Sequence, residues 1–185
     1  MKRLALPTKR GSVLTGVLFD APADKHASTV VIAITGIHGN FYSNPFYVNI
    51  GKTLSAAGID FIYAQTADAF GEIPTVNVKT GQQEVIGSWN EDFNNTDEDI
   101  EAYLNYVYQQ GYQNVILAGH SLGANKVIYY LARHHDYRIS HFLLLSPANL
   151  EHLTSVVTDE EKQAILDQRK RGDGDQRMPF NLLGW

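Results

Sequence analysis

The sequence predicts an α/β protein with a doubly wound, mostly parallel sheet that begins with an antiparallel hairpin. Continuous apolar runs such as TVVIAIT alternate with helix-length amphipathic segments, which is the pattern of βαβ units. Runs without polar alternation are typical of strands that are covered on both faces of a sheet. Two Val- and Leu-rich segments near the amino end flank a short turn that contains proline, which indicates a hairpin.

Composition limits the classes of function. The chain has 185 residues, and its net charge of -5 leaves no basic surface to attract phosphates, so we expect no nucleic-acid partner. The absence of cysteine excludes disulfides and thiolate catalysis. No run approaches the roughly twenty apolar residues of a membrane helix, and the first residues lack the apolar stretch of a secretory signal. We therefore expect no membrane span and a cytoplasmic location.

The first half of the chain predicts most of the sheet. Four strands are expected, at residues 3–6, 11–19, 29–35 and 59–64. A helix connects the last two strands, with Asn44 as its cap and Pro45 as its first residue. This helix is expected to end at Gly58, because glycine favours the left-handed backbone that terminates helices.

The second half begins with a long connection. Residues 65–95 contain several glycines and little periodicity, and we expect an excursion over one end of the sheet. Thr96 and Asp99 resemble a capping box at the start of a helix. The predicted buried face of that helix consists of Ile100, Tyr103, Leu104, Val107 and Tyr108.

The remaining elements complete the pattern. Buried strands are predicted at residues 114–118 and 140–146, separated by a helix that begins at Leu122. Thr158 and Glu161 form a capping box for a last helix. We expect a core domain at residues 1–149, followed by a partial helical cap at 150–185 that is not an independent domain.

The strongest chemical signal is Gly119-His120-Ser121-Leu122-Gly123, which lies between the strand VILA and the helix ANKVIYYLAR. A serine at a strand-to-helix turn is forced into strained backbone, and the flanking glycines are needed where no Cβ fits. Its hydroxyl then stands at a helix N-terminus, which favours developing negative charge. Ser121 is therefore predicted to be a nucleophile; an ordinary helix cap is the alternative.

The stretch VILAGHSLGANKVIYYLARH resembles the nucleophile elbow of the α/β-hydrolase superfamily, which includes serine esterases, lipases and S33-type peptidases. The resemblance extends from the amino-terminal hairpin through Ser146. It implies that the His38-Gly39 turn precedes one donor of an oxyanion hole, the N–H of Asn40 or Phe41. The other donor would be the N–H of Leu122. The alternative for His38-Gly39 is a plain turn.

The resemblance also implies a catalytic acid and then a histidine after Ser121. No convincing strand follows Ser146, and the last histidine of the chain is His152. The chain either lacks the strands that carry the acid and the histidine, or it uses His152 as the base, oriented by Asp159 or Asp173. The cap-like character of residues 150–185 and their apolar end favour the first explanation.

The leading hypothesis is a serine hydrolase of a carboxylic ester, or of an amide or thioester, which forms an acyl-enzyme on Ser121. Its partner would be a small-molecule acyl substrate, and no metal or organic cofactor is implied. The rival is a non-catalytic, hydrolase-like binding domain.

His120 is expected to point away from Ser121. Aromatic residues expected near the site either line an acyl pocket or belong to the core: Phe41, Tyr42, Phe46, Trp89 and Phe93.

Overall fold

The computed structural model describes residues 1–25, 27–41, 43–151, 157–174 and 176. The chain divides into two compact units, Met1–Ala148 and Asn149–Trp185. The second unit contains helix α5 (Asp159–Lys170), which begins with the predicted capping box of Thr158 and Glu161. The role of this unit as a cap stays a prediction.

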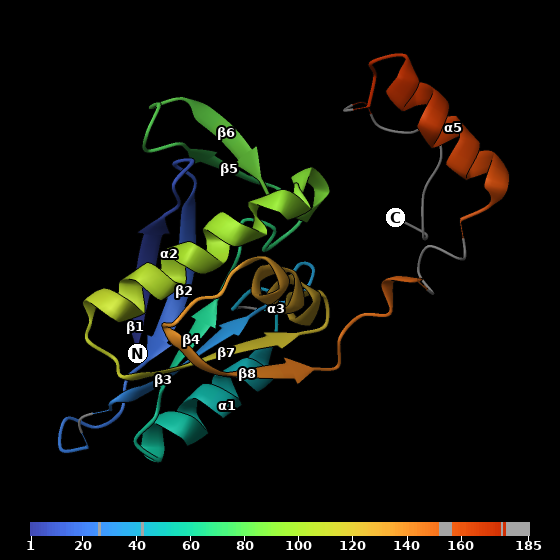
Figure 1. Cartoon of the computed structure of the whole chain (residues 1–185). Helices are drawn as coiled ribbons and strands as arrows, with labels where there is room; N and C mark the ends of the chain where they lie inside the picture. The colour runs from blue at the N-terminus through green and yellow to red at the C-terminus, as the bar shows by residue number, and fades with distance from the viewer. Residues whose placement is uncertain (26, 42, 152–156, 175, 177–185) are drawn as a thin grey trace. The chain divides into compact units, whose positions relative to one another are not determined.

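A six-stranded mixed sheet forms the centre of the first unit (Figure 1). The strands are β1 (Lys2–Pro7), β2 (Val13–Phe19), β3 (Thr29–Ile34), β4 (Asp60–Ala64), β7 (Asn114–His120) and β8 (Ile139–Leu145). Their order across the sheet is β1-β2-β4-β3-β7-β8. The β1–β2 and β2–β4 pairs are antiparallel, whereas β4, β3, β7 and β8 run parallel. The predicted fold class, including the amino-terminal hairpin, is confirmed.

Helices cover both faces of this sheet (Figure 1). Helix α1 (Pro45–Ala56) lies on one face, and α2 (Thr96–Gln109) and α3 (Leu122–Arg133) lie on the other. Each face therefore has its own apolar core. Strands β3 and β4 lie at the centre and are buried along nearly their whole length, which explains their uninterrupted apolar sequences. No helix in the described part of the chain is both long and apolar enough to cross a membrane.

The starts of two helices differ from the predictions. Asn44 precedes α1, but its side chain does not cap the helix; Asn44 Oδ1 instead accepts a hydrogen bond from the Asn40 N–H at 3.1 Å. The predicted capping box at the start of α2 is wrong. The Asp99 carboxylate pairs with Arg10 at 2.5 Å and accepts the Ala67 N–H at 2.8 Å. Asn44 thus bonds within its own loop, whereas tertiary contacts engage Asp99.

The predicted buried face of α2 is correct except at its end. Ile100, Tyr103, Leu104 and Val107 are buried, whereas Tyr108 is exposed. The preceding segment contains more structure than its sequence predicts. It folds into the hairpin of β5 (Ile73–Val76) and β6 (Gln83–Ile86), followed by short 3₁₀ turns at Ser88–Asn90 and Phe93–Asn95. We refer to residues 65–95 as the excursion.

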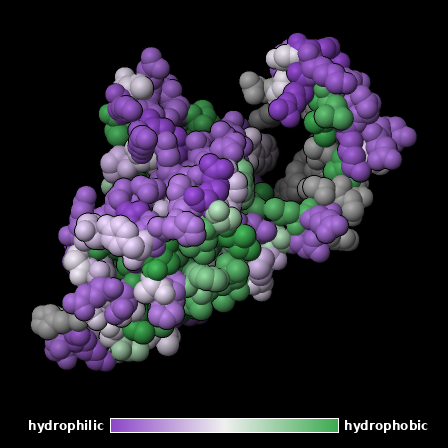
Figure 2. All heavy atoms as spheres, viewed as in Figure 1, coloured by the Kyte–Doolittle hydropathy of each residue, from purple (hydrophilic) through white to green (hydrophobic). Residues whose placement is uncertain are grey.

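Strand β8 departs most from its prediction. The sequence predicts a buried strand, but the side chains from Phe142 to Leu145 are between 37% and 56% exposed. The strand lies at the edge of the sheet and, within the described residues, pairs only with β7. Figure 2 shows an apolar area in this region of the surface. The apolar sequence of β8 is typical of a strand with both faces buried, but the described residues leave its side chains partly exposed.

An open apolar edge strand favours association between copies of a chain. We expect the chain to self-associate, and the double change Leu143→Lys with Leu145→Lys to shift it toward the monomer. Sedimentation velocity over a range of concentrations would measure this shift. The matched change Val78→Lys with Val85→Lys, which alters two exposed valines of the excursion, should leave the distribution unchanged. A parent chain that is monomeric at every concentration would contradict the prediction.

Candidate active site

Ser121 lies in the turn between β7 and α3 and has φ 54° and ψ −127°. L-residues rarely adopt this backbone, so the predicted strain is present. The Ser121 N–H donates to the carbonyl oxygen of Leu145 at 3.0 Å. Its side chain makes no capping hydrogen bond to α3, which argues against an ordinary helix cap. The hydroxyl stands at a helix N-terminus, where the helix dipole stabilises negative charge.

The two glycines of the motif are required by close backbone contacts. A Cβ on Gly119 would lie 2.3 Å from the carbonyl oxygen of Gly123. A Cβ on Gly123 would lie 2.3 Å from the carbonyl oxygen of Ile34 and 2.5 Å from that of Thr35. The first turn of α3 is therefore packed against the carboxyl end of β3. This contact brings Ser121 beside the loop that follows β3.

That loop, residues 36–41, is called the β3 loop below. A Cβ on Gly36 would lie 3.0 Å from Ser121 Cβ and 3.4 Å from Ser121 Oγ. The Gly39 N–H donates to the carbonyl oxygen of Gly36 at 2.9 Å and closes a turn, within which His38 has φ 54°. Gly36 is therefore the residue of this loop that lies directly against the serine.

The two N–H groups predicted as oxyanion donors in this loop already have acceptors. The Asn40 N–H donates to Asn44 Oδ1 at 3.1 Å, and the Phe41 N–H donates to Gln65 Oε1 at 2.7 Å. In contrast, none of the described residues accepts a hydrogen bond from the Ile37 N–H, and Ile37 directly follows Gly36. Leu122 is the first residue of α3, so its N–H has no acceptor within the helix.

Side chains of the excursion hold the β3 loop. Ser88 Oγ donates to the carbonyl oxygen of Phe70 at 2.7 Å and lies 2.6 Å from His38 Nδ1. Gln65 accepts from the loop and also donates from Nε2 to Thr15 Oγ1 at 2.7 Å. The excursion thus contacts the β3 loop at His38 and at Phe41.

A buried lysine connects the excursion to α3. Lys126 Nζ lies 2.6 Å from Asp68 Oδ2 and 3.0 Å from Glu91 Oε1. Burial acts to lower the pKa of Lys126, but the two carboxylates outweigh it and raise that pKa. Burial also raises the pKa of Glu91, against the opposing effect of the Lys126 charge. Lys126 gives no signal of this role in the sequence, because a single lysine in an amphipathic helix normally faces solvent.

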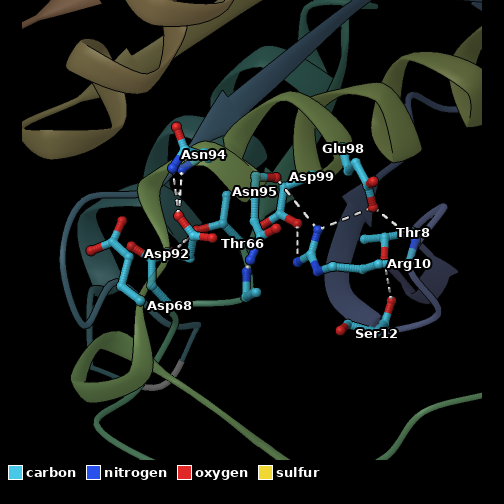
Figure 3. A network of polar contacts seen from close by, with 12 residues as sticks. Thr8, Arg10, Ser12, Thr66, Asp68, Asp92, Asn94, Asn95, Glu98 and Asp99 are labelled. Atoms are coloured by element: carbon cyan, nitrogen blue, oxygen red, sulfur yellow. Dashed lines mark hydrogen bonds and ion pairs between the residues drawn. The ribbon is translucent and has the colours of Figure 1, made fainter. Parts of the chain in front are cut away.

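Lys126 belongs to a larger polar cluster at this end of the sheet. Figure 3 shows Thr66 and Asp68 of the excursion, with Arg10 of the hairpin turn between Glu98 and Asp99 of α2. Burial raises the pKa of Asp99, although the charge of Arg10 opposes this effect. The ion pairs of Arg10 therefore join the hairpin turn to α2, and those of Lys126 join the excursion to α3.

The histidines do not complete a triad in the described part of the chain. His152 lies outside the described residues. His120 packs against the rings of Phe46 and Tyr47, at centroid distances of 5.2 and 5.8 Å, on the side of α1. Among the described residues, no histidine hydrogen-bonds to Ser121 Oγ. The two proposed orienting acids, Asp159 and Asp173, lie in the second unit, beside Lys162 and Arg171.

The aromatic residues near the site divide between core and surface. Phe41 packs against Phe19 and Tyr63, with centroid distances of 6.3 and 5.7 Å. Phe41 also borders, with Phe70 and Gln65, a cavity of about 450 Å³. Trp89 is exposed. Phe93 contacts Tyr129 at 5.2 Å, and Tyr42 lies outside the described residues. A role for these residues in acyl binding stays a prediction.

Several solved structures resemble this one. Est1E from Butyrivibrio proteoclasticus has a TM-score of 0.63 and 18% identity, over 85% of this chain and 56% of Est1E. The α/β hydrolase GrgF from Penicillium sp. sh18 has a TM-score of 0.62 and 19% identity, over 96% of this chain and 56% of GrgF. A thermostable carboxyl esterase from Bacillus coagulans has a TM-score of 0.65 and 12% identity, over 96% of this chain and 53% of the esterase. The chain spans little more than half of each, and at these identities the likeness shows the fold alone.

The family comparison concerns the sequence itself. No curated protein matches the chain. Residues 9–179 match the family described as "Protein of unknown function (DUF1749)", which covers most of the chain. The chain therefore belongs to the DUF1749 family and has the fold of the α/β-hydrolase superfamily.

Proposed function

We propose that the chain acts as a serine hydrolase of a small-molecule carboxylic ester, or of an amide or thioester, with Ser121 as the nucleophile. The observation that carries this proposal is the strained backbone of Ser121 at the N-terminus of α3, with φ 54° and ψ −127°. A structure rarely retains such strain outside functional sites. The esterase and hydrolase names of the structural neighbours are consistent with it.

The reaction would proceed in two halves. Ser121 Oγ attacks the carbonyl carbon, its proton passes to a base, and the carbonyl oxygen becomes an oxyanion. Collapse of this intermediate breaks the ester bond, and the departing alkoxide takes the proton and leaves as an alcohol. Water then attacks the acyl-serine by the same route and releases a carboxylic acid. The base would be His152, with Asp159 or Asp173, or a histidine in a segment outside this chain.

Two backbone N–H groups would stabilise the oxyanion. Leu122 is one donor, because its N–H lies at the free end of α3. We assign the second to Ile37, because Gly36 lies against Ser121 and the Ile37 N–H has no acceptor among the described residues. Asn40 remains the alternative, but its N–H must first leave Asn44 Oδ1. Loss of one such donor typically costs about 2.7–4 kcal/mol of transition-state stabilisation.

A fluorophosphonate probe tests the nucleophile. We expect intact-mass measurement to find one adduct on the parent and none on Ser121→Ala, because only an activated serine reacts with the probe. Hydrolysis of p-nitrophenyl esters should fall by orders of magnitude in the same variant. An adduct that persists in Ser121→Ala would contradict the assignment.

A second candidate function is a non-catalytic binding domain. It is favoured by one observation: no histidine of the described residues hydrogen-bonds to Ser121 Oγ. In that case the probe would label neither protein, and the Ser121→Ala change would leave binding of a partner intact. The two functions therefore predict opposite results for the parent chain in the same experiment.

A further inference from the structure

We propose that Lys126 is a positioning residue that fixes the separation between the two oxyanion donors, Leu122 on α3 and Ile37 on the β3 loop. The inference rests on the proposed function. It assigns a role to a buried charge that the reaction itself does not use.

The contacts of Lys126 all point to the excursion. Its side chain is only 3% exposed. Among the described residues, the groups that contact its ammonium belong to the excursion: Thr66 Oγ1 at 3.4 Å, Asp68 Oδ2 at 2.6 Å, Glu91 Oε1 at 3.0 Å and the Phe93 ring centroid at 5.9 Å. A buried ammonium without such partners is strongly unfavourable, so these contacts hold the excursion to α3.

Lys126 follows Leu122 by four residues and therefore lies one helical turn further along α3. Any shift of the excursion relative to Lys126 is also a shift relative to the Leu122 N–H. The helix between them is continuous, so it transmits the position of the ion pairs to its own first turn.

The excursion also holds the β3 loop, through different residues. Gln65 accepts the Phe41 N–H at 2.7 Å, and Ser88 Oγ lies 2.6 Å from His38 Nδ1. The excursion thus bridges the two segments that would supply the oxyanion donors. The close contact between Gly36 and Ser121 limits how near these segments can approach. The ion pairs of Lys126 limit how far they can separate.

A test must distinguish positioning from a general loss of stability, because removal of Lys126 leaves two buried carboxylates without their cation. Arg138 offers a matched control. It is also largely buried, at 12% exposure, and it also joins two carboxylates, Asp136 at 2.5 Å and Glu101 at 3.1 Å. None of these residues belongs to the excursion or to the β3 loop.

The experiment compares Lys126→Met with Arg138→Met. Turnover of p-nitrophenyl butyrate is normalised to the fraction of serine that a fluorophosphonate labels, and hydrogen exchange is followed in peptides that cover residues 36–41. We expect Lys126→Met to lower kcat per labelled site by up to about 100-fold with KM unchanged, since small misplacements have effects of this size. Exchange in the β3 loop should become faster. Arg138→Met should lower the melting temperature without either effect.

Two results would overturn the proposal: a kcat per labelled site in Lys126→Met equal to that of the parent, or the same loss in Arg138→Met. If Lys126→Met does not fold, the variant Lys126→Met/Asp68→Asn/Glu91→Gln removes the three charges together and is compared in the same way. A parent without Ser121-dependent labelling would contradict the proposed function instead. The rate of hydrogen exchange at residues 36–41 would then be the deciding measurement. Equal exchange rates in the parent and in Lys126→Met would show that Lys126 does not hold the β3 loop in place through the excursion.

Discussion

Gly123→Ala is expected to disrupt the turn that holds Ser121 and to destabilise the fold. The new Cβ would lie 2.3 Å from the carbonyl oxygen of Ile34 and 2.5 Å from that of Thr35. Both obstacles are backbone atoms at the end of the central strand β3, so neither can rotate away. Ordinary overpacking costs about 1–3 kcal/mol, and we expect this change to exceed that range. Urea denaturation would measure the loss.

The same change should abolish fluorophosphonate labelling, because relief of the clash requires α3 to move away from β3 and carries Ser121 with it. Gly174→Ala is the control: its Cβ would lie 3.9 Å from the nearest atoms, an ordinary contact. A Gly123→Ala protein with the parent's stability and labelling would show that the backbone contact between α3 and β3 is not required.

The sequence predicts the central elements because most of their residues are buried. Strands β3, β4 and β7 have neighbours on both sides, and helices cover both faces of the sheet, so apolar residues fill most of their positions. The strain at Ser121 is also predictable, because the two glycines of the motif are needed for the approach of α3. In both cases the sequence constraint acts over a few neighbouring residues.

The excursion shows where local patterns fail. The side chains of its hairpin, β5 and β6, alternate between half-buried and exposed, but the half-buried side includes Thr75 and Glu84, so the sequence shows no apolar alternation. The ion pairs that hold it join residues far apart in the chain, such as Lys126 with Asp68. Asp99 is a further case: it lies in a local capping pattern, but its carboxylate pairs with Arg10 instead. Such pairs depend on the tertiary fold and leave no periodic signal.

Strand β8 presents the opposite problem. Its apolar sequence correctly indicates a strand suited to burial, but the described residues do not supply the cover. The choice of oxyanion donor shows a third limit of local sequence patterns. The His38-Gly39 turn suggests Asn40, yet the residue that lies against the serine is Gly36, and only the packing of the two segments reveals it.

Ile37→Pro is expected to reduce kcat by about 10²–10³-fold, because proline has no N–H to donate to the oxyanion. Ile37→Ala keeps the N–H and removes most of the exposed side chain, so it should retain most of the activity. The comparison of these two variants separates the backbone donor from the side chain. KM should change little, since an oxyanion donor acts mainly in the transition state.

Asn40→Pro tests the alternative donor in the same assay. Asn40→Pro removes the N–H bond to Asn44 Oδ1 and also the side-chain hydrogen bonds to His38 and Ser43. Asn40→Ala removes only the side-chain bonds and is the control. If Ile37 is the donor, both variants should keep most of kcat. A large loss in Asn40→Pro together with normal turnover in Ile37→Pro would reject Ile37. The β3 loop would then have to release Asn44 before each reaction. In that case Asn44→Ala, which removes the competing acceptor, should raise kcat, and the hydrogen bond seen here would be an inhibitory contact.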